Sequence, residues 1–128
     1  MAYNANMDAN FRVLVVDDNE SAAKALQKLL TLRGHEVSAV FTGEAAMSSF
    51  AEADPDVILL DIGLPYMDGY EVARRLRDEL HYEGTIVALT GYGQDADKEH
   101  AEGAGINFHL TKPAGLSEIE EIFAKIVR

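Results

Sequence analysis

The segment Val57-Ile58-Leu59-Leu60-Asp61 is a continuous apolar run that ends in a carboxylate. Short runs rich in β-branched residues predict strands buried on both faces of a sheet, and Val13–Val16 and Ile86–Leu89 are runs of the same kind. Two further segments, Glu36–Val40 and Ile106–Leu110, alternate between apolar and polar residues, as strands with one less-covered face do. The sequence therefore predicts three central strands and two edge strands.

Between these five segments, apolar residues recur at the spacing of helices. The clearest sets are Ala22, Leu26, Leu29 and Leu30; Val72, Leu76 and Leu80; and Ile119, Ile122, Phe123 and Ile126. Five strands that alternate with five helices predict a parallel sheet with right-handed crossovers and helices on both faces. With the apolar runs in the centre, the strand order 2-1-3-4-5 fits best, which is the flavodoxin-like, doubly wound α/β arrangement.

Local signals agree with these boundaries. Gly34, Gly84 and Gly105 each precede a predicted strand, where the end of a helix favours a residue that tolerates positive φ. Ser117, followed three residues later by Glu120, predicts a capping box at the start of the last helix.

The length and composition indicate a single domain. The chain has 128 residues, of which 48% are hydrophobic, and this is enough for one core. We expect the domain to span residues 11–128, preceded by a flexible segment or tag at residues 1–10. The first residues lack the basic start and apolar stretch of a signal peptide, and no apolar run approaches the ~18 residues of a spanning helix.

The charge narrows the possible partners. The chain carries 22 Asp and Glu against 11 Lys and Arg, a formal net charge of -11, which repels nucleic-acid phosphates and anionic lipid surfaces. We therefore expect no direct contact with nucleic acid and no membrane association. Cysteine is absent, which excludes disulfides and thiolate metal sites and is compatible with the cytoplasm. We expect the protein to be cytoplasmic and to form a monomer or a weak dimer.

Polar residues follow the predicted strands where ligands bind in open parallel sheets, beyond the carboxyl ends of the strands. They are Asp17 and Asp18, Asp61, Thr90 and Lys112. A single Asp after a strand is more often a helix N-cap than a catalytic group. Three carboxylates at one edge, however, raise one another's pKa unless a cation compensates. Hard oxygen ligands favour Mg²⁺ or Mn²⁺, and such a site predicts a phosphorylated substrate.

The same residues support phosphoryl transfer to the protein. Asp61 lies at the centre of the predicted sheet and is the best-placed nucleophile for forming an acyl phosphate. Lys112 would pair with a phosphoryl oxygen, and the hydroxyl of Thr90 would donate a hydrogen bond to another. Asp17 and Asp18 would hold the metal ion.

Four segments carry a resemblance to a known family: Val15–Asn19, Leu59–Gly69, Ala88–Gly91 and Leu110–Pro113. In this order and at these positions they resemble response-regulator receiver domains, and the resemblance covers nearly the whole chain. It implies a two-component phosphorelay, in which a sensor histidine kinase or a histidine phosphotransfer protein donates the phosphoryl group. It also implies a signalling module that switches partner binding. Such a module is not an enzyme beyond its own phosphotransfer and slow autodephosphorylation.

The resemblance assigns roles to individual residues. It implies that Asp61 is the phosphoacceptor, and that Asp17, Asp18, Asp61 and the backbone carbonyl of Gly63 bind the metal ion. It makes Thr90 the switch hydroxyl and the residue at 112 the phosphate-binding lysine.

The last motif also brings a departure from the family pattern. The resemblance implies a cis peptide bond between Lys112 and Pro113. Three residues before the lysine the family usually has Tyr or Phe, and here it is His109. We interpret His109 as an ordinary edge-strand residue, with a moving side chain coupled to Thr90 as the alternative. A histidine at this place, together with the segment Thr90–Gln94, is most similar to the receivers of hybrid histidine kinases.

Two other functions stay open at this point. The first is a phosphohydrolase of the haloacid dehalogenase type, although Asp61 is followed by Ile62-Gly63 and lacks that family's second acid. The second is a pseudo-receiver that binds partners without phosphorylation. The remaining histidines, His35, His81 and His100, have no ligand-like spacing, and we expect them on the solvated surface.

Overall fold

The structure is a computed structural model and describes residues 10–91 and 103–126. The strands are β1 (Arg12–Val16), β2 (Glu36–Val40), β3 (Val57–Asp61), β4 (Thr85–Thr90) and β5 (Phe108–Thr111). The helices are α2 (Glu20–Leu32), α3 (Gly43–Ala53), α4 (Gly69–Asp78) and α6 (Leu116–Lys125).

Four of the five expected helices are thus present in the described part of the chain. The fifth was expected between β4 and β5, and most of that connection, residues 92–102, lies outside the described residues. So does nearly all of the expected N-terminal segment, residues 1–10.

The sheet has the predicted topology. All strand pairs are parallel and the order is β2-β1-β3-β4-β5. The register aligns Val16 with Leu60 and Leu60 with Ala88, so the strands end together at one edge. Residues of β3 are all buried, whereas those of β2 and β5 are at most partly buried. The division into apolar central strands and alternating edge strands is confirmed.

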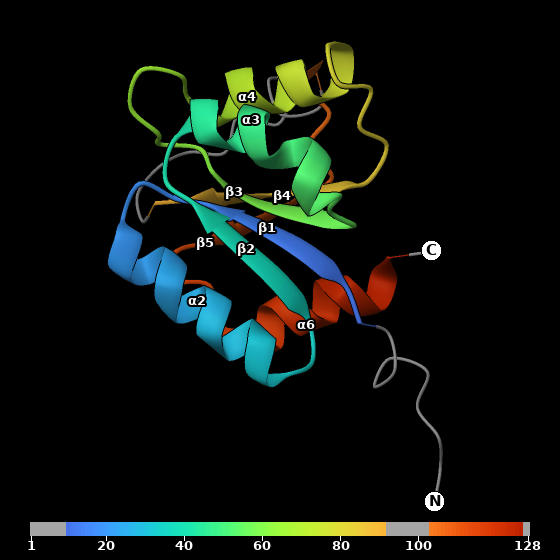
Figure 1. The fold of residues 1–128 in the computed structure, drawn as a ribbon. Helices are drawn as coiled ribbons and strands as arrows, with labels where there is room; N and C mark the ends of the chain where they lie inside the picture. Colours follow the sequence, from blue (N-terminus) through green and yellow to red (C-terminus); the bar gives the residue numbers. More distant parts are fainter. Residues whose placement is uncertain (1–9, 92–102, 127–128) are drawn as a thin grey trace, which may run out of the picture.

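Two helical layers cover the sheet, with α2 and α6 on one face and α3 and α4 on the other (Figure 1). Successive side chains of a strand point to opposite faces, so each central strand contributes to two cores. Leu60 packs with Val72 of α4 on one face, and its neighbour Leu59 packs with Leu30 and Ile119 on the other. This two-sided burial explains why the inner positions of the central strands are all apolar, with polar residues only at strand ends.

The helix starts show one error of prediction. The expected capping box of Ser117 and Glu120 is wrong, because α6 begins at Leu116 and its N-cap is Gly115. The carboxylate that reaches back is Glu118, which accepts a hydrogen bond from the Gly115 N–H at 3.2 Å. Glu120 instead pairs with Arg33 of α2 at 2.9 Å, an ion pair that links the two helices of this layer.

Only some of the glycines before the strands have the backbone conformation that was predicted for them. Gly34 and Gly105 have positive φ, +96° and +83°, as predicted. Gly84 does not have positive φ, and glycine suits this position for another reason. A Cβ there would lie 2.4 Å from Cζ of the Tyr82 ring. Close approach of an aromatic ring, rather than backbone conformation, accounts for this glycine.

The expectation that His35 lies on the solvated surface is wrong. The turn at Gly34 directs His35 inward, where it is 9% exposed and its ring meets that of Phe123 edge-on at 5.1 Å. Its Nδ1 accepts a hydrogen bond from the Phe11 N–H at 3.1 Å. His81 is exposed as expected, and His100 lies outside the described residues.

Across the described ranges, no helix combines the length and the apolar character needed to cross a bilayer.

Candidate functional site

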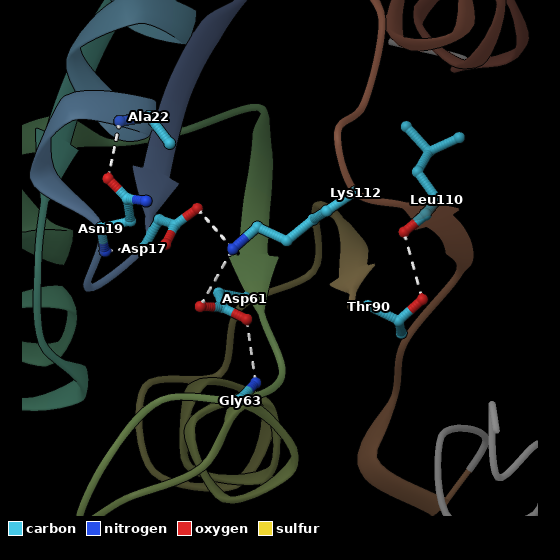
Figure 2. Close-up of polar contacts among 8 residues, drawn as sticks. All are labelled: Asp17, Asn19, Ala22, Asp61, Gly63, Thr90, Leu110 and Lys112. Carbon is cyan, nitrogen blue, oxygen red and sulfur yellow. Dashed lines mark hydrogen bonds and ion pairs between the residues drawn. The ribbon is translucent and has the colours of Figure 1, made fainter. Parts of the chain in front are cut away.

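The carboxyl edge of the sheet brings the predicted residues together (Figure 2). Asp17 follows β1, Asp61 ends β3 and Thr90 ends β4, while Lys112 follows β5. The parallel register places these strand ends side by side, with Asp61 beside Leu89 and Thr90 beside Thr111. Asp61 therefore occupies the middle of the edge, with polar groups on both sides.

Lys112 is the cation of the site. Its Nζ lies 2.9 Å from Asp17 Oδ2 and 3.3 Å from Asp61 Oδ2. Asp17 and Asp61 are only 3% and 5% exposed, so water can offset little of their charge. Among the described residues, one ammonium group thus serves two buried carboxylates, which leaves a net negative charge at the edge of the sheet.

Backbone amides hold the other oxygen of each carboxylate. The N–H of Asn19 donates to Asp17 Oδ1 at 3.0 Å, and the N–H of Gly63 donates to Asp61 Oδ1 at 2.9 Å. In both cases the donor is two residues after the Asp, in the turn that leaves the strand. The Asn19 side chain also caps α2 by accepting from Ala22 N–H at 3.1 Å (Figure 2). These turns fix the direction of both carboxylates.

The environment shifts two pKa values upward. Burial is the largest influence on Asp61 and raises the pKa of its carboxyl group, and the nearby Asp17 charge and Asp18 act in the same direction. The hydrogen bond from Gly63 and the charge of Lys112 oppose this without cancelling it. For Lys112, burial lowers the pKa, but hydrogen bonds and attraction from Asp17 and Asp61 outweigh it and the net shift is upward.

Three carboxylates are arranged as a metal ion would require. Oxygen atoms of Asp17, Asp18 and Asp61 all lie within 4.8 Å of one another. Asp17 and Asp61 are buried while Asp18 is exposed, so the group opens to solvent on the side of Asp18. An all-oxygen donor set with one open side suits Mg²⁺ or Mn²⁺, which keep several water or phosphoryl ligands. The donor set therefore fits the predicted metal.

Thr90 and Lys112 connect the last two strands. The Thr90 hydroxyl donates to the Leu110 carbonyl at 3.4 Å, a long hydrogen bond, and the Lys112 N–H donates to the Thr90 carbonyl at 2.7 Å. The peptide bond between Lys112 and Pro113 is cis, as the resemblance implied. His109 lies on edge strand β5, and its Nε2 is buried without a hydrogen-bond partner in the described structure. The interpretation of His109 as an ordinary edge residue stays a prediction.

Gly69 is a positioning residue that sequence reasoning missed. It begins α4, and its N–H donates to the Ile62 carbonyl at 3.0 Å. A Cβ on Gly69 would lie 2.6 Å from both the carbonyl oxygen of Asp61 and the Cα of Ile62. The available signal was the Asp68-Gly69 pair at the end of the Leu59–Gly69 segment. Asp68 is in fact the N-cap of α4, accepting from Glu71 N–H at 3.0 Å.

Comparisons with known proteins agree on one family. The family model described as response regulator receiver domain matches residues 13–124. The chain is 40% identical over 106 residues to the transcriptional regulatory protein KdpE of Mycobacterium tuberculosis, covering 83% of this chain and 46% of that protein. It is 32% identical over 123 residues to a probable transcriptional regulator ycf27 of Guillardia theta, covering 96% and 48%. The chain thus spans about half the length of these curated relatives.

Solved structures give the same result. The Vibrio cholerae chemotaxis protein CheY4 superposes with a TM-score of 0.82 at 26% identity, covering 90% of this chain and 97% of the other. The CheY-like receiver domain from Methylobacillus flagellatus gives a TM-score of 0.79 at 28% identity, with the same coverage. The matched family is a signalling family, which favours a receiver over the phosphohydrolase alternative.

Proposed function

Because this chain belongs to the response regulator receiver domain family, and so is a phosphoacceptor of two-component signalling, we propose that Asp61 is the residue that receives the phosphoryl group. One observation carries the proposal. Asp61 is a buried carboxylate at the centre of the sheet edge, with an ammonium group 3.3 Å from one oxygen and an amide donor 2.9 Å from the other.

The neighbouring side chains act on the transferred group. An oxygen of Asp61 attacks phosphorus while the bond from phosphorus to the donor histidine nitrogen breaks, and that nitrogen keeps the bonding electron pair. Lys112, whose ammonium already contacts Asp61 Oδ2, would move onto a phosphoryl oxygen. The weakly held hydroxyl of Thr90 would leave the Leu110 carbonyl and donate to a second phosphoryl oxygen.

Asp17, Asp18, Asp61 and the carbonyl of Gly63 would hold a Mg²⁺ or Mn²⁺ ion. A bound divalent cation supplies positive charge that stabilises the phosphoryl oxygens during transfer. The clustering of three carboxylates within 4.8 Å supports this assignment, as does the surplus of negative charge beside Lys112. Backbone donors that orient Asp17 and Asp61 would keep their oxygens in place as the ion binds.

We propose a sensor histidine kinase or a histidine phosphotransfer protein as the phosphodonor, in the cytoplasm. The relatives are named as transcriptional regulators, but this chain covers less than half of their length. Its formal net charge of -11 supports a domain that does not itself contact nucleic acid. Phosphorylation would instead change which protein the domain binds, and slow autodephosphorylation would end the signal.

The proposal is tested by intact mass spectrometry after incubation with Mg²⁺ and acetyl phosphate. We expect the chain to gain one phosphoryl group. We expect no gain in the Asp61→Asn variant or in a sample treated with EDTA. Labelling of Asp61→Asn to the level of the unsubstituted chain would disprove the assignment of Asp61. No adduct under any condition would favour a pseudo-receiver.

A further inference from the structure

Tyr66 has an unusual backbone and side-chain environment. Its φ is +67°, in the left-handed region, and the Met67 N–H donates to the Pro65 carbonyl at 2.7 Å. These two features define a γ-turn centred on Tyr66, a type of turn that is rare and strained. The side chain is 108% exposed, so it makes almost no contact with the rest of the domain.

Folding does not account for a tyrosine at this position. Left-handed φ is unfavourable for residues with a large side chain, whereas glycine adopts it freely and asparagine tolerates it. A fully exposed ring recovers none of that cost through burial. Strained backbone at an exposed residue is found most often where function requires it.

The turn is attached to the phosphoacceptor on both sides. It follows Asp61 in the loop from β3 to α4, which leaves the carboxyl edge of the sheet before α4 begins (Figure 1). Before the turn, Leu64 is buried in the core. After it, Gly69 packs against the backbone of Asp61 and Ile62. The turn is therefore held between two fixed points near Asp61, with the Tyr66 ring in solvent.

We propose that Tyr66 is a contact residue for the phosphohistidine-bearing protein that phosphorylates Asp61. This inference rests on the proposed function. A donor histidine must come within bonding distance of Asp61, so the protein that carries it must cover the loops around that carboxylate. Tyrosine is among the residues that contribute most to protein interfaces, because it supplies a large contact area at a small entropic cost.

The chain offers a matched control for exposed apolar surface. Leu32 is 74% exposed and is the last residue of α2. That helix begins just after Asp17 and Asn19, so Leu32 lies about 20 Å farther along the helix axis from the site. Loss of apolar surface at Leu32 should leave donor recognition unchanged.

The experiment compares two phosphodonors on four proteins: the unsubstituted chain, Tyr66→Gly, Tyr66→Asn and Leu32→Ser. The small donor is acetyl phosphate. The protein donor is a purified histidine phosphotransfer protein carrying phosphohistidine. It is selected beforehand for its ability to phosphorylate the unsubstituted chain. Thermal unfolding of each variant is measured alongside.

We expect Tyr66→Gly and Tyr66→Asn to keep the unsubstituted rate with acetyl phosphate, and their unfolding temperatures not to fall. With the protein donor, the second-order rate constant for phosphoryl transfer should drop about tenfold or more, mainly through weaker binding of the donor. Leu32→Ser should match the unsubstituted chain with both donors.

Three results would overturn the inference while leaving the proposed function in place. They are an unchanged rate of transfer from the protein donor to both Tyr66 variants, an equal loss in Leu32→Ser, or a lowered unfolding temperature that accompanies equal losses with both donors. An unchanged rate would mean that Tyr66 does not contact the phosphodonor, and a protein that binds the phosphorylated domain would become its expected partner. Failure of acetyl phosphate to label even the unsubstituted chain would instead reject the proposed function itself.

Discussion

Arg77 and Lys112 are partly buried cations at opposite ends of the same sheet, and their surroundings differ. Arg77 lies at the amino ends of β4 and β5, where its guanidinium donates to the carbonyls of Tyr82, Gly84 and Gly105 at 2.7–3.1 Å. It also donates to Asn107 Oδ1 at 3.0 Å. All of these acceptors are neutral. Lys112, at the carboxyl ends, lies between two buried carboxylates.

The pKa shifts reflect this difference. Burial lowers the pKa of Arg77, and the charge interaction with Tyr82 opposes this only in part. Attraction to Asp17 and Asp61 raises the pKa of Lys112 despite burial. At the amino end the polar groups satisfy one another and stabilise the fold. At the carboxyl end two carboxylates share one ammonium group, and the remaining charge is available for a ligand.

The largest expected loss of stability follows a substitution at the amino end of the sheet. Replacing Arg77 by Met removes a set of charged hydrogen bonds that connects α4 to the segments before β4 and β5, and leaves several carbonyls without this donor. We expect the free energy of unfolding in urea to fall by about 3 kcal/mol. Labelling by acetyl phosphate at a temperature where the variant is folded should be retained. Loss of labelling in the folded variant would contradict the separation of the two ends.

A substitution at the carboxyl end of the sheet should affect both the stability of the fold and the rate of phosphorylation. In Gly69→Ala the new Cβ would lie 2.6 Å from the carbonyl oxygen of Asp61, so the loop after β3 must shift. We expect unfolding to become easier by about 2 kcal/mol and labelling by acetyl phosphate to slow strongly. Gly103→Ala is the matched control, because none of the described residues has an atom within 4 Å of its added Cβ. Normal labelling of Gly69→Ala would show that the loop tolerates the shift.

Neutralising Asp61 should stabilise the fold. Asp61→Asn keeps the shape of the side chain but removes one of the two buried negative charges beside Lys112. Because burial raises the pKa of Asp61, its charged form is unfavourable in the folded state. Without divalent cations, we expect the free energy of unfolding to rise by about 1 kcal/mol in urea titrations at neutral pH. A loss of stability would mean that Lys112 requires both carboxylates.

The stability advantage of Asp61→Asn over the unsubstituted chain should depend on pH in a defined direction. The pKa of Asp61 in the folded protein is raised above the ordinary value of 3.8, so ionisation begins to destabilise the fold above 3.8 and does so fully above the raised pKa. Below 3.8 the group is protonated in both the folded and the unfolded states, and the difference disappears. The free energies of unfolding of the two proteins in urea should therefore converge as the pH falls through the raised pKa and below 3.8. If the two free energies of unfolding moved apart on acidification, the pKa of Asp61 could not be raised by burial as described.

The sequence predicted more of the carboxyl end than of the amino end. The site residues follow apolar runs whose strand character is clear, so Asp17, Asp61 and Thr90 could be placed at one edge before the structure was known. The role of Arg77 depends on three carbonyls from two separate loops, and no pattern in the sequence indicates that convergence. His35 was misplaced for the same reason, since its burial depends on α6 packing across the start of β1.

The last helix shows a different limit. Ser117 and Glu120 have the spacing of a capping box, but Glu118 forms an equivalent contact with Gly115 two residues earlier. Local spacing permits both starts. Tertiary contacts select one, because Glu120 pairs with Arg33 across the layer. Close approaches such as that of Gly69 to Asp61 are likewise set by packing between elements and not by local preference.

The most direct test of the contrast between the two ends is the stability of the unsubstituted chain and Asp61→Asn as Mg²⁺ is added. Without Mg²⁺ the variant should be the more stable protein. With Mg²⁺ at about 100 times its dissociation constant, the unsubstituted chain should gain about 2.7 kcal/mol and become the more stable of the two. An equal gain in both proteins, or no gain in either, would contradict the claim that Asp61 and its neighbours form a charged site completed by a cation.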